Sequence, residues 1–255
     1  MGLPFMIPIK TPEKIEAMRT AGRISAKVLR KTGELVRPGI STLELDRFAE
    51  NLIRLEGARP AFKGYGGFTG SICASINNQI VHGIPSAEVI LQEGDIISID
   101  TGAIFDGWYG DNAATYAVGE IAPEAARLLE VTEQSMWAGI DAAQVGGHLG
   151  DIGHAIQGIA EAAGFSVVRE YVGHGIGKAM HEDPVVPNFG RKKTGLKLKA
   201  GMVFAIEPMI NVGGYRTRGP YLDGWIVYTA DDSLSAHFEH TVALTVDGPE
   251  ILTAE

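Results

Sequence analysis

Two ten-residue segments of this chain repeat one pattern at a spacing of 107 positions. Residues 91–100 read LQEGDIISID, and residues 198–207 read LKAGMVFAIE. Leucine, glycine and isoleucine recur at equivalent places, apolar residues match apolar residues between them, and each segment ends in an acid, Asp100 or Glu207. A repeat of this kind predicts two copies of one structural unit that pack against each other.

The residues ahead of the first segment predict two helices. Thr11 and Pro12 are of the types found where helices begin, and an apolar stripe of helical period continues from them to Gly33. Ser41 and Glu44 have the spacing of a capping box, and the helix that they open should end at Gly57. The first unit is therefore expected to place two helices before its strands.

The second unit repeats this order. Residues 123–143 read as one helix, and a second over 149–163 should stop at Gly164, again 107 positions after Gly57. We therefore predict one α+β domain over residues 1–255, built from pseudo-equivalent halves at about 12–118 and 123–252. The alternative is that glycine-then-strand patterns recur by chance, and the matching helix end argues against it.

Both repeated strands carry a carboxylate directly after an apolar run. A buried carboxylate needs a cation or hydrogen-bond donors. Beyond Asp100, the Asp106-Gly107 pair is a strong signal for a hairpin turn. A hairpin centred near Phe105 and Asp106 would place Asp100 nearly opposite Asp111. Two acids so close predict a positive ion between them.

The second half adds Glu207, Glu239 and His174, the last between two glycines. Each of these residues alone would more often be a turn, strand-end or loop residue, and the symmetric placement of Asp100 and Glu207 favours a shared centre. Four carboxylates and a neutral imidazole carry a charge of about −4, which two divalent cations would cancel. Oxygen-rich ligands favour manganese, iron or cobalt-like ions over a thiolate zinc site.

Composition limits the other function classes. The net charge of −9 opposes a role built on nucleic-acid binding. One cysteine, Cys73, excludes an internal disulfide. The first ten residues make a poor signal peptide, and no apolar run reaches the ~18 residues of a membrane span. We therefore expect a cytoplasmic protein with no membrane and no stable nucleic-acid partner.

At these residues the sequence resembles the type I methionine aminopeptidases. The matching segments are SICASINNQIVHGIP (71–85), DIISIDTGAIFDGWYGDNAAT (95–115), GFSVVREYVGHGIGKAMHEDP (164–184), LKAGMVFAIEPMI (198–210) and DGWIVYTADDSLSAHFEHT (223–241). The resemblance implies the pita-bread fold of creatinases and aminopeptidases, in which helices cover an antiparallel sheet made of two pseudo-symmetric halves. The long insertion of type II enzymes is absent between Glu207 and Glu239.

The resemblance also implies a role for each ligand. Asp100 would chelate one divalent ion, and His174 and Glu207 would hold a second. Asp111 and Glu239 would bridge the two ions, which could be cobalt, manganese, iron or zinc. The family removes the initiator methionine from nascent proteins whose second residue is small and uncharged, through a hydroxide that bridges the metals.

Further residues match the family's catalytic and substrate-binding positions. His82 would contact the scissile amide, His181 would hydrogen-bond the substrate carbonyl, and Glu207 would shuttle the proton. The matches to the methionine pocket are Tyr65, Phe68, Cys73, Met180 and Trp225. Ordinary core packing is the alternative for Phe68 and Trp225. The chain departs from the commonest pattern at Tyr109, Asn112 and Met180.

Two other functions stay open at this point. One is an Xaa-Pro aminopeptidase of the same fold, and the other is a binding module without activity. The partner expected for an aminopeptidase is the N-terminal peptide of a nascent protein, and the expected state is a monomer. The basic stretch RKKTGLKLK (191–199), with Lys10, Lys14, Arg19 and Arg23, could make a transient contact with the ribosome, or be an ordinary solvated loop.

Overall fold

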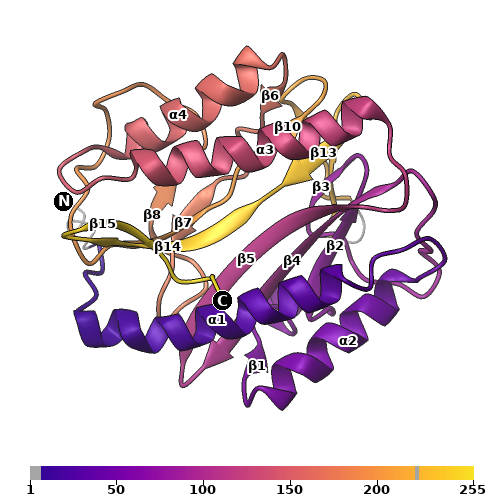
Figure 1. The fold of residues 1–255 in the computed structure, drawn as a ribbon, viewed down its shortest axis with the longest axis horizontal. Coiled ribbons are helices and arrows are strands. Elements are labelled where there is room, and N and C mark those ends of the chain that lie inside the picture. Colours follow the sequence, from indigo (N-terminus) through magenta and orange to yellow (C-terminus); the bar gives the residue numbers. More distant parts are fainter. Residues whose placement is uncertain (1–6, 222–223) are drawn as a thin grey trace.

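The computed structural model describes residues 7–221 and 224–255. Two pairs of helices lie along two halves of one large sheet, with one pair on each half (Figure 1). The helices are α1 (Pro12–Gly33), α2 (Thr42–Leu55), α3 (Pro123–Ala142) and α4 (Leu149–Ala162). All four were predicted, with bounds within two residues. The expectation about a signal peptide concerns residues 1–10, of which the first six lie outside the described residues.

The large sheet is antiparallel throughout and has nine strands in the described part of the chain. Its main order is β1-β4-β5-β14-β9-β7-β8, with β2 added on β4 and β15 on β14. Its strands are β1 (Arg59–Pro60), β2 (Ile72–Ile76), β4 (Ile96–Phe105), β5 (Trp108–Ala117), β7 (Gly173–Gly175), β8 (Glu182–Val186), β9 (Val203–Ile206), β14 (Glu239–Thr245) and β15 (Gly248–Ile251). The two halves therefore meet where β5 pairs with β14.

Two smaller sheets lie at one end of the large sheet. One has the order β13-β10-β6 and the other β11-β12-β3. Their strands are β3 (Gln79–Val81), β6 (Ser166–Val167), β10 (Met209–Asn211), β11 (Thr217–Arg218), β12 (Val227–Thr229) and β13 (Ser235–His237). A 3-10 turn, η1 (Tyr65–Gly67), follows β1. None of the helices among the described residues is both long enough and apolar enough to cross a membrane.

The repeat is visible in how the second helix of each half begins. The Ser41 N–H donates to Glu44 Oε2 at 2.9 Å before α2, as the capping-box prediction requires. The His148 N–H donates to Asp151 Oδ2 at 2.7 Å before α4. These two pairs are 107 positions apart, so both halves use an acid at the same helical position to bind the same backbone group.

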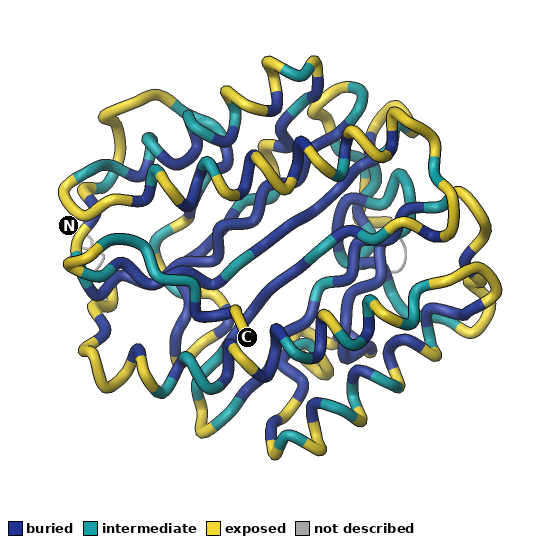
Figure 2. The backbone as a smooth tube through the Cα atoms, viewed as in Figure 1, coloured by how far each residue is buried: buried dark blue, intermediate teal, exposed yellow. Residues whose placement is uncertain are grey.

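The core confirms the same equivalence. Side chains of α2 and β4 that are fully buried in the first half, Leu45 and Ile97, have counterparts 107 positions later in Ile152 of α4 and Phe204 of β9, which are also fully buried. Figure 2 shows the buried backbone concentrated along the central strands and on the sheet-facing sides of the helices. Each half thus builds its own apolar core between a helix pair and the sheet.

The predicted hairpin forms, with a register different from the predicted one. The turn is Asp106-Gly107, both at positive φ (49° and 73°), and Phe105 pairs with Trp108. The centre of the hairpin is one residue later than predicted. The two acids therefore do not face each other directly: Asp100 pairs with Ala113, and Asp111 pairs with Gly102.

We also expected Asp100 to end its strand and Glu239 to begin the last strand of the chain, and the structure corrects both expectations. Asp100 lies inside β4, because the hairpin continues pairing to Phe105. Glu239 does begin β14, yet β14 is followed by β15, which pairs back onto it from Val242 to Thr245. Glu207 directly follows β9 as predicted.

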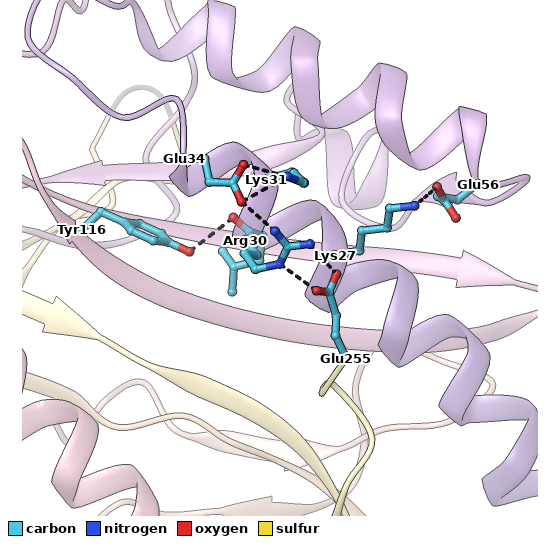
Figure 3. Close-up of polar contacts among 8 residues, drawn as sticks. Lys27, Arg30, Lys31, Glu34, Glu56, Tyr116 and Glu255 are labelled. Carbon is cyan, nitrogen blue, oxygen red and sulfur yellow. Dashed lines mark hydrogen bonds and ion pairs between the residues drawn. The ribbon is translucent and has the colours of Figure 1, made fainter.

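The chain end returns to the first helix. Glu255 forms an ion pair with Arg30 of α1, whose guanidinium also contacts Glu34, and Lys27 links α1 to Glu56 beyond α2 (Figure 3). The Tyr116 hydroxyl of β5 donates to the Leu29 carbonyl at 3.2 Å in the same region. The Glu255 ion pair joins the C-terminal residues to α1, and the other contacts join α1 to the segment after α2 and to β5.

Candidate metal centre and substrate pocket

Because side chains alternate along a strand, Asp100 and Asp111 point to the face of the sheet away from the helices. Asn112 of β5 faces α1, where its side-chain oxygen lies 2.7 Å from the Ser25 hydroxyl. Because neighbouring residues of a strand point to opposite faces, Asp111 points to the other face of the sheet. Asp100 pairs with Ala113, two residues from Asp111, so it lies on that same face.

The third carboxylate joins them from the neighbouring strand. Ala113 pairs with Asp100 on one side and with Glu239 of β14 on the other. The methyl side chain of Ala113 leaves room between the two carboxylates that flank it. His240, the next residue, faces the opposite side, where its ring lies 5.3 Å from that of Trp137 in α3.

The fourth acid and the imidazole come from the second half. His174 of β7 pairs with Ala205 of β9, and Glu207 follows two residues later. The His174 Nε2 lies 3.4 Å from Glu207 Oε1 and 3.8 Å from Asp111 Oδ2. Its Nδ1 lies 2.9 Å from the Gly175 carbonyl oxygen, which can only accept a hydrogen bond. Nδ1 therefore carries the proton, and Nε2 presents a lone pair to the carboxylates.

These side chains fit divalent metal ions. Single ligand atoms of Asp111, His174 and Glu239 all lie within 4.8 Å of one another. Within the described part of the chain, the buried oxygens Asp100 Oδ1, Asp111 Oδ1 and Glu239 Oε1 have no hydrogen-bond partner. Buried carboxylate oxygens without donors are costly, and a cation would satisfy them. The Nδ1 hydrogen bond of His174 is the usual support for a ligating imidazole.

Burial raises the pKa of every carboxyl in the cluster. It raises the pKa of Asp111 to about 7. Burial, with repulsion from Asp111, raises the pKa of Asp100, Glu207 and Glu239 well above the usual range. Burial also lowers the pKa of His174 to about 4. Without cations these carboxyls would keep protons near pH 7. The four negative charges counted from the sequence would therefore form only when cations are bound beside them.

One pocket of about 200 Å³ opens onto the cluster. All twelve side chains predicted as catalytic, ligating or substrate-binding line it. Six further lining residues were not predicted: Phe62, Val81, Tyr171, Val172, Met209 and His237. The structure therefore brings together the whole predicted set, drawn from both halves of the sheet.

Two predicted histidines lie in the pocket beside the ligands. His82 has a positive φ of 61°, and its ring packs edge-on against Tyr171 and Trp225. Burial lowers the pKa of His82 to about 4 and also lowers that of His181. The His181 ring lies 4.3 Å from the ring of His174. Both histidines are therefore neutral near pH 7 and can each offer one N–H and one lone pair.

The walls of the pocket are apolar. Phe68 packs edge-to-face on Trp225 with ring centroids 5.1 Å apart. Cys73 of β2 is buried and unpaired, and burial beside the acids raises its thiol pKa well above the usual value. A thiol that stays protonated is a wall residue and not a nucleophile. Met180 is also buried in the lining.

His237 is the one histidine of the pocket lining that was not predicted from the sequence. Its Nε2 lies 3.5 Å from Glu207 Oε2, on the side of the carboxylate away from His174. Burial lowers the pKa of His237 to about 3. A histidine two residues before Glu239 on alternating strand positions could have drawn attention to it. Both residues line the pocket, although Phe238 separates β13 from β14.

Comparison with known proteins identifies the family of this chain. Residues 16–246 match the model of metallopeptidase family M24. The chain is 54% identical to a methionine aminopeptidase of Clostridium acetobutylicum and 52% identical to methionine aminopeptidase 1 of Bacillus subtilis, over 97% of this chain and 99% of each relative. The crystal structure of methionine aminopeptidase from Rickettsia prowazekii superposes with a TM-score of 0.96 at 48% identity, covering 98% of this chain and 100% of that one.

A more distant structure shows how far the fold extends. Prolidase from Pyrococcus furiosus superposes with a TM-score of 0.76 at 24% identity, over 97% of this chain and 65% of the prolidase. That likeness concerns the pita-bread fold alone, whereas the relatives near 50% identity match the chain from end to end. The chain therefore belongs to metallopeptidase family M24, among its methionine aminopeptidases.

Proposed function

We propose that this protein is a metalloaminopeptidase that removes the initiator methionine from nascent proteins whose second residue is small and uncharged. The observation that carries the proposal is the carboxylate and imidazole cluster at the base of a small apolar pocket. Relatives of about 50% identity that bear the name methionine aminopeptidase support the same reaction. One catalytic domain, residues 1–255, would hold the whole site.

The proposed cofactor is a pair of divalent ions, drawn from cobalt, manganese, iron and zinc. Asp100 would hold one ion, and His174 with Glu207 would hold the other. Asp111 and Glu239 would bridge the two ions from the adjacent strands β5 and β14. Bound there, the ions would lower the pKa of water enough to supply hydroxide near neutral pH.

The protein's own groups would orient the peptide. A neutral His181 would donate a hydrogen bond to the scissile carbonyl, where negative charge develops. His82 would contact the departing amide nitrogen, and Glu207 would carry the proton toward it. The unbranched methionine side chain would pack against the Phe68 and Trp225 rings, since a thioether contacts aromatic rings favourably.

A peptide panel tests this function directly. We expect the protein reconstituted with Mn²⁺ or Co²⁺ under anaerobic conditions to cleave Met-Ala-Ser and Met-Gly peptides and to spare Xaa-Pro peptides. Metal analysis of the same sample should give two ions per chain. Preference for Xaa-Pro peptides would support the related peptidase of the same fold, and metal-loaded but inactive protein would support a binding module.

The finer biological context is also proposed. Nascent N-termini are made in the cytoplasm, so we place the protein there, acting as a monomer. Five exposed bases of the 191–199 stretch, Arg191, Lys192, Lys193, Lys197 and Lys199, could contact ribosomal RNA. Lys10 does not belong to that surface, because it is buried and its Nζ lies 2.7 Å from Glu182 Oε2.

Charge reversal tests the ribosome contact. Replacing residues 191–193 with glutamate should reduce co-sedimentation with ribosomes while peptide cleavage stays unchanged. The matched control reverses three exposed arginines elsewhere, Arg47, Arg59 and Arg127. Equal co-sedimentation of both variants and the unmodified protein would remove the idea.

A further inference from the structure

The loop at residues 64–68 places a tyrosine within hydrogen-bond distance of one of the pocket histidines. The Tyr65 hydroxyl lies 2.8 Å from His181 Nδ1, and the two rings are 5.5 Å apart. Tyr65 comes from the first half, in η1, and His181 comes from the second half, just before β8. This hydrogen bond therefore joins the two halves across the mouth of the pocket.

We propose that Tyr65 is a positioning residue that donates its hydroxyl proton to His181 Nδ1 and so keeps the ring proton of His181 on Nε2. The inference rests on the proposed function, in which His181 must offer an N–H to the substrate carbonyl. A neutral imidazole carries one proton, and the partner of one ring nitrogen decides where that proton lies. With Nδ1 accepting from Tyr65, Nε2 is the donor.

The neighbouring histidine has the opposite arrangement. Nδ1 of His174 donates to the Gly175 carbonyl, which leaves the Nε2 lone pair facing the carboxylates. The two rings lie 4.3 Å apart, so two tautomers stand side by side in one site. One ring is set for a metal ion by a carbonyl acceptor. The other is set for an oxyanion by a hydroxyl donor.

The loop is built to hold Tyr65 in place. Gly64 and Gly67 on either side have φ values of 87° and 92°, which glycine adopts without strain. The Gly64 N–H donates to the Phe68 carbonyl at 2.8 Å, and the Tyr65 N–H donates to the Phe62 carbonyl at the same distance. Although 44% of Tyr65 is exposed, its backbone is fixed on both sides.

Kinetics of Tyr65→Phe provide the first test. The ring remains as a pocket wall, so KM for Met-Ala-Ser should change less than twofold. Loss of the Nε2 donor population should lower kcat about tenfold, as expected for weakening one hydrogen bond to developing charge. Replacing Tyr65 with 3-fluorotyrosine, a stronger proton donor, should keep kcat at or above the original value. Tyr215→Phe, an exposed tyrosine outside the pocket, is the matched control.

Nitrogen-15 NMR of the Zn²⁺-loaded protein measures the tautomer of His181 and does not depend on enzyme activity. His181 should show a proton on Nε2 in the original protein and a larger Nδ1–H population in Tyr65→Phe. An Nδ1–H tautomer in the original protein, or a Tyr65→Phe variant with unchanged kcat and unchanged His181 shifts, would overturn the proposal. If the original protein cleaves no methionyl peptide, the proposed function fails while the NMR result still decides the role of Tyr65.

Discussion

The two halves of the molecule share a backbone frame but supply different chemistry. Ser75 of β2 pairs with Ser98 of β4, and His174 of β7 pairs with Ala205 of β9. Ser98 and Ala205 are 107 positions apart, so Ser75 and His174 occupy equivalent places beside equivalent strands. Ser75 Oγ accepts a hydrogen bond from the Gly83 N–H at 3.0 Å, whereas His174 faces the carboxylates. At equivalent positions, the side chain of the first half binds the backbone and the side chain of the second half faces the pocket.

The repeat determines where the backbone lies in each half, but it does not determine which side chain occupies each position. The shared frame brings Asp100 and Glu207 to the same centre from symmetric strands. The imidazoles break the symmetry: three of the four that line the pocket, His174, His181 and His237, come from the second half. Carboxylate charge is therefore contributed by both halves, while most neutral donors and acceptors are contributed by one.

The largest effect should come from the acid at the junction of the halves. Asp111→Asn removes the charge that we propose bridges both ions, so the protein should lose metal and at least about 100-fold in activity, more than outer-shell changes usually cost. Isothermal titration with Mn²⁺ and a cleavage assay measure both. Asp106→Asn, an exposed acid in the hairpin turn, is the control. Two bound ions and full activity in Asp111→Asn would contradict the bridging role.

A histidine of the second half should affect turnover without affecting metal. His181→Ala removes the proposed donor to the developing oxyanion, and losses of about 10²–10³-fold in kcat are typical for such donors. The ligands are untouched, so metal content should stay near two ions per chain. His154→Ala in α4, outside the pocket, is the matched control. A parallel loss of metal and turnover would mean that His181 also supports the ligands.

The helices, the faces of the strands and the contacts within the site differ in how well the sequence predicted them. Helix bounds were predictable because caps and glycines mark them locally, as at Ser41 and Gly164. The face on which Asp100 and Asp111 lie was also predictable, although the hairpin centre was off by one residue. That error shifts pairing by two positions and so leaves each side chain on the same face. The alternation of His237 with Glu239 indicated the face on which His237 lies, but the contact between His237 and Glu207 joins two strands and could not be predicted from spacing.

His237 tests whether the missed residue belongs to the site. Its buried Nε2 has no hydrogen-bond partner and lies 3.5 Å from Glu207 Oε2, while His174 Nε2 lies 3.4 Å from Oε1. We expect an N–H at this position to orient the carboxylate. His237→Leu should weaken metal binding about 10–100-fold, as loss of an orienting partner usually does. His237→Gln, which keeps an N–H donor, should retain most of the affinity. Equal affinities for the two variants would show that packing by the His237 ring, and not a donor facing Glu207, is what matters.

Metal removal should make stability depend on pH. Burial raises the folded-state pKa of Asp111 to about 7 and raises those of Asp100, Glu207 and Glu239. A carboxyl with a raised folded pKa contributes stability at low pH that is lost as pH rises through that pKa. Above about pH 7.5 the histidines of the unfolded chain, whose pKa is near 6.5, have lost most of their protons. From there to pH 8.5 the carboxyls dominate, so the urea midpoint of chelator-treated protein should fall.

The control for this pH effect is the metal-loaded protein. Bound cations satisfy the carboxylates in their charged form, so its urea midpoint should be nearly constant from pH 7.5 to 8.5. Glu239→Gln should reduce the slope of the metal-free protein, because one titrating carboxyl is gone. A midpoint that rises with pH in the metal-free protein would contradict the raised pKa values.

The smallest effect tests the shared frame itself. Ser41 Oγ accepts from the Glu44 N–H at 3.2 Å, so Ser41→Ala should cost about 1 kcal/mol, or roughly 2–4 °C in Tm for a chain of this size. At the equivalent cap the Asp151 carboxylate binds the backbone N–H of His148, which alanine retains, so His148→Ala should cost less. Calorimetry of both metal-loaded variants measures the difference. Equal losses of stability would mean that the two halves cap their helices in the same way. A smaller loss for His148→Ala would mean that equivalent backbone positions are held by different side chains at the helix caps, as they are at Ser75 and His174.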